Sequence, residues 1–284
     1  MIRINQIKMP LHHDAAALEQ KIRKRLGLSG GQELRYRIIR KSIDARKKPE
    51  LSLVYSVEVS ASGEEKIIKR ANDPNVTIVK QTGYYLPGAV SPTPSIPPVI
   101  VGAGPAGLFC GLMLARAGFR PVILERGADV DTRTKEVKRF WEEGTLNPES
   151  NVQFGEGGAG TFSDGKLNTL VKDVSGRNTE VLRILTEAGA DESILYSSKP
   201  HVGTDVLSRV VKRLREEIIS LGGEVRFLTR AADLIVQDGA VTAVKTGHPE
   251  RGEEMIPARA VVLAVGHSAR DTFQTLFEKG ISME

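Results

Sequence analysis

Apolar and polar residues alternate through the first 86 residues in a pattern that predicts a small α+β domain. Period-2 segments predict strands at 2–7, 34–38, 51–59 and 76–79. Residues 43–50 are expected to connect the second strand to the third. Helical spacing predicts a helix that Asp14 caps and Gly27 ends, and the capping box of Ser62 and Glu65 predicts a short second helix. The resulting order, β-α-β-β-α-β, is the split βαβ or ferredoxin-like arrangement.

A proline-rich stretch separates this domain from the rest of the chain. Residues 87–98 contain five prolines, which exclude a helix or a central strand. We therefore predict an N-terminal domain at 1–86, a semi-rigid connector at 87–97 and a second domain at 98–284.

The second domain has the pattern of a nucleotide-binding α/β fold. Apolar runs predict strands at 98–101, 121–124, 225–228 and 260–265, and helices after residue 104 and from 204 or 205 to 221. Asp238 and Gly239 predict a tight turn in a β-hairpin inserted before the last strand. Residues 127–203 give mixed signals. The order favours a Rossmann-like sheet with a β-hairpin excursion.

The turn after the strand at 98–101 contains a candidate phosphate-binding motif. Its sequence is Gly102-Ala103-Gly104-Pro105-Ala106-Gly107, a GxGxxG motif that opens a helix. Such glycines permit the tight turn, the approach of a pyrophosphate to the backbone and close packing of the helix on the strand. Glu125 ends the next predicted strand, 23 residues after Gly102, where an acid can bind a ribose diol. The pattern predicts a dinucleotide site.

Composition limits the compartment and the chemistry. The 284 residues are 40% hydrophobic and 26% charged, typical of a soluble globular protein, and no apolar stretch predicts a membrane span or a signal peptide. The single cysteine, Cys110, cannot form an internal disulfide, so we expect a cytoplasmic protein without dithiol chemistry. Within the apolar helix, Cys110 is expected to be a small core residue.

Several motifs together resemble one known family. They are GAGPAG, then ILERG with a later arginine, a β-excursion, AVVLAVGHSARDTF, and the block NVQFGEGGAGTFSDGKL at 151–167. Over almost the whole chain they resemble bacterial FAD-dependent oxidoreductases of the two-dinucleotide-binding-motif superfamily. Where that superfamily has an Ala-Thr-Gly-like motif, this chain has Ala264-Val265-Gly266. The resemblance implies hydride transfer through FAD to or from an unidentified small molecule, with NAD(P)H a candidate donor by analogy.

The resemblance also implies cofactor contacts. Residues 102–107 would hold the FAD pyrophosphate, and Glu125, with Arg126 beside it, the adenosine ribose. Arg133 would reach a phosphate or the ribityl chain, unless it is a solvated charge on a helix. Val225 would offer its backbone to the adenine, and Gly266 would approach the cofactor.

The 151–167 block contains a second GxGxxG, Gly155 to Gly160, but no strand precedes it and no helix or acid follows. We therefore predict no second nucleotide site. Its glycines, including Gly158 and Gly160, would let backbone amides approach the flavin, with Thr161, Ser163 and Lys166 as polar contacts. Lys166 would place positive charge near the reduced flavin. The alternative is an ordinary flexible loop.

Other assignments stay open. His267 is either an acid or base near the flavin or a hydrogen-bonding turn residue, and we assign no catalytic residue. His12, His13 and His201 lack partners at ligand spacing, so we predict no metal site.

The basic N-terminal part suggests a rival function. Residues 1–90 hold 17 Lys and Arg against nine acids, while the whole chain carries +5. Its basic stretch, residues 35–48, is either a nucleic-acid contact or a charged solvent face, and few aromatic residues accompany it. The chain ends 18 residues after Gly266, where the pattern indicates mid-domain. We therefore expect an incomplete FAD-binding domain, and a non-catalytic nucleotide-binding module is a further alternative.

Overall fold

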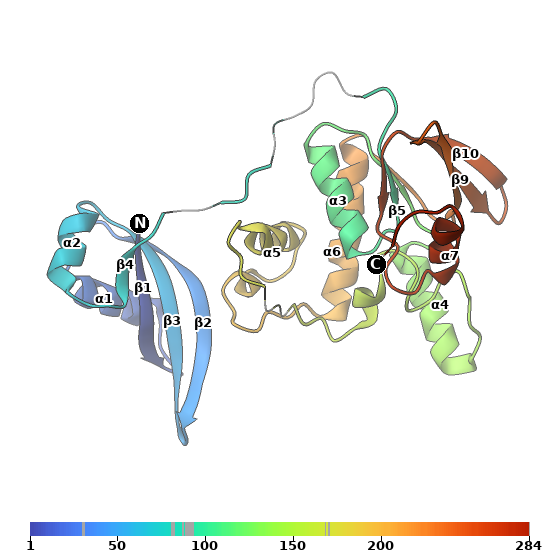
Figure 1. The fold of residues 1–284 in the computed structure, drawn as a ribbon. Helices are drawn as coiled ribbons and strands as arrows, with labels where there is room; N and C mark the ends of the chain where they lie inside the picture. The colour runs from blue at the N-terminus through green and yellow to red at the C-terminus, as the bar shows by residue number, and fades with distance from the viewer. Residues whose placement is uncertain are drawn as a thin grey trace. The chain divides into compact units, whose positions relative to one another are not determined.

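A computed structural model describes residues 1–29, 32–80, 83–86, 88, 94–167, 169 and 171–283. The chain forms two compact units (Figure 1). The first contains Met1–Tyr84, Lys166–Thr186 and Asp191–His201, and the second contains Tyr85–Gly165, Glu187–Ala190 and Val202–Glu284. Of the predicted connector 87–97, residues 87 and 89–93 lie outside the described part, and the predicted domain boundaries stay predictions.

The first unit begins with the predicted β-α-β-β-α-β order. Its elements are β1 (Ile2–Pro10), α1 (Ala15–Leu26), β2 (Arg35–Lys47), β3 (Glu50–Ser60), α2 (Glu64–Ala71) and β4 (Val76–Ile78). The strands form an antiparallel sheet in the order β2-β3-β1-β4. Apolar residues of β1, β3 and the two helices share one buried core.

Two local predictions in this unit are wrong. Residues 43–47 continue β2, because Ile43 pairs with Leu53 and Lys47 with Glu50, so the connection to β3 is a tight turn. Helix α2 starts after Gly63, whose φ is 79°, and has no side-chain cap from the predicted capping box. The Asp14 cap is confirmed, since its side chain accepts a hydrogen bond from the Ala17 amide at 2.7 Å.

A later segment of the chain completes the first unit. It carries most of α5 (Arg177–Glu187) and the 3-10 helix η2 (Glu192–Leu195). The Lys41 amide of β2 donates to the Tyr196 carbonyl at 2.7 Å, and the Ser198 amide donates to the Lys41 carbonyl at 3.0 Å. Strand β2 thus binds a segment about 150 residues away along the chain through main-chain hydrogen bonds.

The second unit is built on a parallel sheet in the order β11-β5-β6-β7. Its elements are β5 (Val99–Val101), α3 (Pro105–Arg116), β6 (Val122–Leu124), α4 (Val130–Glu143), η1 (Ala159–Phe162), α6 (Thr204–Ser220), β7 (Glu224–Arg226), β8 (Arg230–Gln237), β9 (Ala240–His248), β10 (Gly252–Pro257), β11 (Val261–Leu263) and α7 (Arg270–Glu278). From β5 the chain first builds toward β6 and β7 and finally returns to the other side with β11. Such a reversal creates a crevice at the carboxyl ends of β5 and β11.

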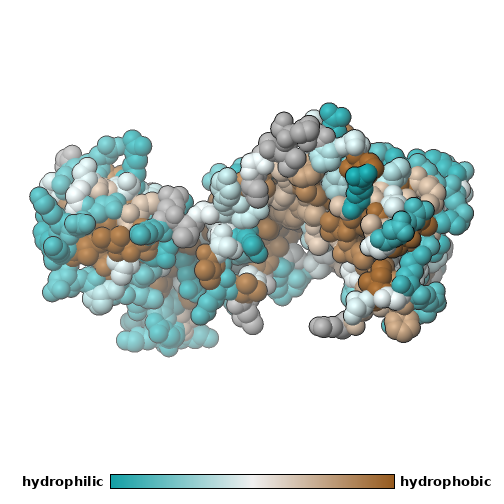
Figure 2. All heavy atoms as spheres, turned by 45° about the horizontal axis from the view of Figure 1, so that its top comes forward, coloured by the Kyte–Doolittle hydropathy of each residue, from teal (hydrophilic) through white to brown (hydrophobic). Residues whose placement is uncertain are grey.

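The predicted hairpin is confirmed and is larger than expected. Gln237 pairs with Ala240 across the turn of Asp238 and Gly239, and β10 extends the sheet to the order β10-β9-β8. Charged and polar side chains cover much of the visible surface (Figure 2). Among the described residues, no helix is long and apolar enough to cross a membrane.

Candidate functional site

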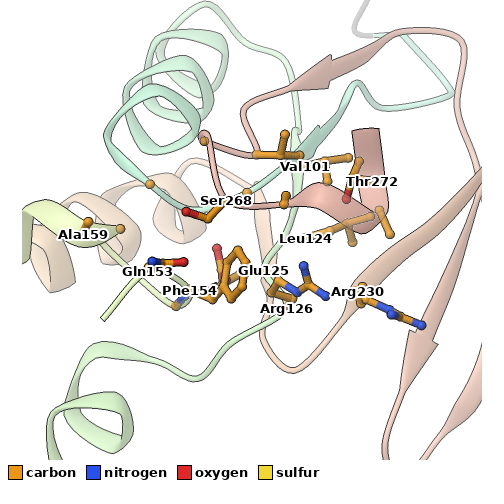
Figure 3. A pocket seen from close by; sticks show the side chains of 18 of the residues that line it. Val101, Leu124, Glu125, Arg126, Gln153, Phe154, Ala159, Arg230, Ser268 and Thr272 are labelled. Carbon is orange, nitrogen blue, oxygen red and sulfur yellow. Dashed lines mark hydrogen bonds between the residues drawn. The ribbon is translucent and has the colours of Figure 1, made fainter. Parts of the chain in front are cut away.

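A cavity opens where strands β5, β6 and β11 end (Figure 3). Turns from distant parts of the sequence line it: Val101, Gly102, Gly104, Pro105, 124–126, 153–155, 158–159, 229–231, 265–269 and Thr272. The predicted glycine turn, Glu125, Arg126 and Gly266 therefore meet at one place. This is the position at which open α/β sheets bind ligands.

The glycine turn has the shape that the motif predicts. Gly102 has a φ of 104°, and a Cβ atom there would collide with the carbonyl oxygen of Ala264 next to β11. A Cβ atom at Gly107 would collide with the carbonyl oxygen of Gly102. Gly104 caps α3, and Pro105 and Ala106 begin the first turn of the helix, whose amides have no partners within the helix. The Gly102–Gly107 turn is thus a bare-backbone turn, one without side-chain bulk at its glycines, at the N-terminus of α3, where the helix dipole is positive.

Glu125 is held at the cavity by backbone amides. The residue is 4% exposed, and its Oε2 accepts a hydrogen bond from the Ala103 amide at 2.7 Å. Its Oε1 accepts hydrogen bonds from the amides of Gly127 and Gly155, both at 2.9 Å. The carboxylate therefore joins the glycine turn to the 151–158 loop while lining the cavity.

The 151–158 loop is docked on the glycine turn. The Gly157 amide donates to the Ala103 carbonyl at 2.8 Å, and the Glu156 amide donates to the Ala128 carbonyl at 3.1 Å. Gly158 lies so close that an added Cβ atom would be 3.2 Å from the Gly104 Cα. These contacts favour a built part of the site over an ordinary flexible loop.

Arg133 lies inside this loop, and neither of its predicted environments is found. It is on α4, but it is fully buried and so is not a solvated charge. Its guanidinium donates to five backbone carbonyls of the loop, those of Asn151, Val152, Gly155, Glu156 and Gly158, at 2.7–3.3 Å. It does not line the cavity. Burial lowers the pKa of Arg133 to about 10, against the opposing effect of nearby Glu125, Glu156 and Glu136, so the group stays charged near neutral pH.

Arg126 forms the rim of the cavity next to Phe154. It bonds Glu149 at 2.9 Å and Asp271 at 2.8 Å, and its guanidinium lies over the Phe154 ring, 4.4 Å from the centroid (Figure 3). Burial would lower the pKa of Arg126, but the hydrogen bonds from its guanidinium to Asp271 and Glu149 prevail and raise it. The hydrogen bond from Arg126 also holds the pKa of Asp271 below its usual value.

The cavity lining does not include several other predicted residues: Ala103, Ala106, Gly107, Gly160, Thr161, Lys166 and Val225. Val225 pairs with Ile123 on the edge strand β7, and the β8 residue Ala231 lines the cavity. Lys166 belongs to the first unit. Thr161 is 1% exposed in η1, and among the described residues its Oγ1 has no hydrogen-bond partner.

Gly160 lies in η1 next to Ala159, which lines the cavity although Gly160 does not. His267 lines the cavity, is exposed and lies 3.3 Å from the Ser268 hydroxyl. Cys110 is half-buried on α3 and not a fully buried core residue, and its burial raises the pKa of the thiol.

Sequence reasoning gave no role to several residues that line the cavity. Thr229, Arg230 and Ala231 lie outside every quoted motif, whereas Gln153, Phe154, Ser268, Ala269 and Thr272 lie within quoted motifs but were not singled out. Arg230 and Ala231 come just before the predicted hairpin strand at 233–237 and begin the observed strand β8, so their place there is a signal that could have found them. In the described part of the chain, no group of His, Cys, Asp and Glu is arranged to hold a metal ion.

The basic stretch of the first unit is partly neutralised. Arg37 pairs with Glu58 at 2.6 Å, Arg46 with Asp44 at 2.8 Å and Arg35 with Glu33 at 2.9 Å. These pairs favour a charged solvent face over a phosphate-binding surface.

Comparisons with known proteins place the chain next to sequence relatives and solved structures. An uncharacterized protein of Clostridium beijerinckii is 45% identical over 285 residues, which cover 100% of this chain and 52% of the relative. The chain thus spans about half the length of that curated relative.

Solved structures with a similar fold include THI4 of Thermovibrio ammonificans, with 20% identity, 66% of this chain and 64% of that chain covered, and a TM-score of 0.44. The myxobacterial chondrochloren halogenase CndH has 16% identity, coverage of 62% and 38%, and a TM-score of 0.39. Glycine oxidase from Bacillus cereus has 14% identity, coverage of 66% and 59%, and a TM-score of 0.35. These likenesses are too distant to bear on activity.

Two families match parts of the chain. Residues 1–60 match a domain of unknown function (DUF8436). Residues 96–275, well over half of the chain and the whole of the cavity, match the family described as FAD binding domain. The protein therefore belongs to the FAD binding domain family.

Proposed function

We propose that the protein is an FAD-dependent oxidoreductase that binds the cofactor in the cavity at the ends of β5, β6 and β11. One observation carries the proposal: the bare-backbone turn at the start of α3 and the buried carboxylate of Glu125 line the same cavity. A glycine turn that has no side chain at Gly104, at the N-terminus of a helix, fits a pyrophosphate. An acid at the end of the second strand fits a ribose diol.

In this proposal each part of the site binds one part of the cofactor. The free amides at the start of α3, those of Ala106 and Gly107, donate to the pyrophosphate, and Glu125 accepts from the adenosine ribose. The cavity has a volume of about 150 Å³, below the ~300–1,000 Å³ of sites that enclose whole ligands. We therefore assign the enclosed part to the ADP half of FAD.

Bound FAD supplies hydride acceptance and donation at its flavin ring. The chain's own residues would bind and orient it, with Gly158, Ala159 and Gly266 as the backbone wall. His267 and Ser268 line the same cavity, and no catalytic residue is assigned. The substrate is unassigned, and NAD(P)H is the candidate donor by analogy only.

The visible spectrum of the purified protein after reconstitution with FAD and gel filtration tests cofactor binding. We expect a retained flavin spectrum. Anaerobic addition of NADH or NADPH then tests the oxidoreductase, because loss of the oxidised flavin absorbance reports reduction. A retained flavin that dithionite reduces but neither NADH nor NADPH reduces would exclude NAD(P)H as the donor.

Gly104→Ala tests the assignment of the pyrophosphate. The backbone φ of −71° accepts alanine, and the new Cβ atom would lie 3.9 Å from its nearest neighbour, the Gly158 Cα, so the ligand-free fold is not strained. We expect the methyl group to block the close approach of the phosphates and to weaken FAD binding at least about tenfold. Gly247→Ala is the control, since its Cβ atom also meets open space and Gly247 does not line the cavity. Equal FAD affinity of both variants would refute the assignment.

A further inference from the structure

Arg133 is completely buried and does not line the cavity. Its charge therefore has a different task from direct contact with the cofactor. The Nε donates to the Asn151 carbonyl at 2.8 Å and the Nη2 to the Val152 carbonyl at 2.8 Å. The Nη1 donates to the carbonyls of Glu156 and Gly158 at 2.7 and 2.9 Å, and more weakly to Gly155 at 3.3 Å. A planar guanidinium is the side chain whose donors can serve so many acceptors at once.

The loop around Arg133 is shaped to fit the side chain. A Cβ atom at Gly155 would collide with the Arg133 Cδ. The Arg133 guanidinium also lies over the Phe162 ring, with its Cζ 4.8 Å from the ring centroid. Because glycines lose much conformational freedom on ordering, a loop this rich in glycine needs such contacts to keep one shape.

The other side of the loop faces the proposed FAD site. Carbonyls of the loop point at Arg133, and two amides of the loop point the other way. The Gly155 amide donates to the Glu125 carboxylate at 2.9 Å, and the Gly157 amide donates to the Ala103 carbonyl at 2.8 Å. Glu125 and the glycine turn are the two groups assigned above to the ribose and the pyrophosphate. A continuous path of hydrogen bonds therefore runs from Arg133 to both.

Glu156 fixes the same loop from a third direction. Its Oε2 accepts a hydrogen bond from the Val130 amide at the start of α4 at 2.7 Å. Its Oε1 lies 3.2 Å from the Nε of Arg215 on α6, an ion pair without hydrogen-bond geometry. Glu125, Glu156 and Glu136 oppose the effect of burial on the Arg133 pKa, while burial raises the pKa of Glu156 itself.

We infer that Arg133 is a positioning residue, which acts through the 151–158 loop to hold Glu125 and the Gly102–Gly107 turn in the shape that receives the ADP half of FAD. The inference rests on the proposed function. It replaces the direct phosphate or ribityl contact that the resemblance implied for Arg133.

Arg133→Ala tests the inference, with Arg139→Ala as a matched control because Arg139 is an exposed arginine on the same helix. Calorimetric titrations with ADP and with FAD are measured for both variants and the parent. We expect Arg133→Ala to weaken both ligands at least about tenfold and Arg139→Ala to bind like the parent. Ethylguanidinium at millimolar concentration should restore much of the lost affinity in Arg133→Ala alone, an effect that general destabilisation would not produce.

Two results would overturn the inference while leaving the proposed function intact. One is a folded Arg133→Ala protein that binds ADP and FAD as the parent does. The other needs no variant: in the ligand-free parent, amide hydrogen exchange in peptides covering 151–158 as fast as in exposed turns would show that the loop is not held. Slow exchange there supports the inference, even if Arg133→Ala fails to fold. A parent that binds neither ligand would refute the proposed function itself.

Discussion

At the scale of single residues, Phe154 is the aromatic side chain that the cavity offers to a nucleobase. Arg126 lies over its ring and is itself fixed by Glu149 and Asp271, so the ring is held in place. Stacking of a base on an aromatic ring contributes about 1–3 kcal/mol. We predict that Phe154→Leu weakens ADP binding at least about fivefold, whereas Phe154→Tyr keeps it.

Calorimetric titration with ADP measures this effect. Phe277→Leu is the matched control, because Phe277 is 68% exposed on α7 and does not line the cavity. If Phe154→Leu and Phe277→Leu bind ADP equally well, the nucleobase does not stack on Phe154.

Asp271 gives the rim of the cavity a defined dependence on pH. The hydrogen bonds from Arg126 hold its pKa below the usual value, so the folded protein binds this proton less tightly than the unfolded chain. The stability that Asp271 contributes is therefore present above the unfolded pKa of about 3.9 and is lost as the pH falls through the lower folded pKa. We predict that the melting temperature of the parent falls more steeply than that of Asp271→Asn between about pH 5 and pH 3.

Thermal unfolding followed by circular dichroism at several pH values tests this prediction. Asp205→Asn, at an exposed position on α6, should keep the steep dependence of the parent. Parallel curves for the parent and Asp271→Asn would contradict it.

At the scale of elements, the pairing of β2 with residues 196–198 is a structural contact that motifs do not reveal. Ser198→Pro removes the amide that donates to Lys41, whereas Ser198→Ala keeps it. Loss of one such bond costs about 0.5–1.5 kcal/mol. We predict that Ser198→Pro makes residues 166–201 more sensitive to limited proteolysis and that Ser198→Ala leaves them like the parent. Equal cleavage rates of the two variants would show that this pairing does not hold the segment.

The elements that the sequence predicted are those whose signals are local. The β5 turn, α3 and the position of Glu125 follow from glycines and apolar runs adjacent in the sequence, and the structure confirms this unit. The turn at Asp238 was predictable for the same reason. By contrast, the burial of Arg133 depends on carbonyls 18–25 residues away, which no local pattern encodes.

The different positions of Val225 and Ala231 have a similar cause. Both residues lie near a predicted strand start, and apolar character cannot distinguish β7, the edge strand of the parallel sheet, from β8, which begins at the cavity. Strand β10 was missed because its exposed glutamates break the apolar alternation, while its backbone pairs with β9.

At the scale of the whole molecule, the two units differ in what they should do when a ligand binds. The cavity belongs to the second unit, and so does Trp141, the one tryptophan of the chain. A ligand that binds only the folded form stabilises it by about 2.7 kcal/mol at a concentration of 100 Kd. ADP should therefore raise the midpoint of the fluorescence transition of Trp141.

The first unit contains no part of this cavity, so its own unfolding should not respond to ADP. Amide hydrogen exchange distinguishes the units: with saturating ADP, peptides of β5, α3 and β6 should exchange more slowly, and peptides of β1 and β3 at an unchanged rate. Gly104→Ala, measured at the same ADP concentration, should lose most of the protection in the second unit. Equal protection of both units by ADP would mean that the nucleotide is not bound by the second unit alone.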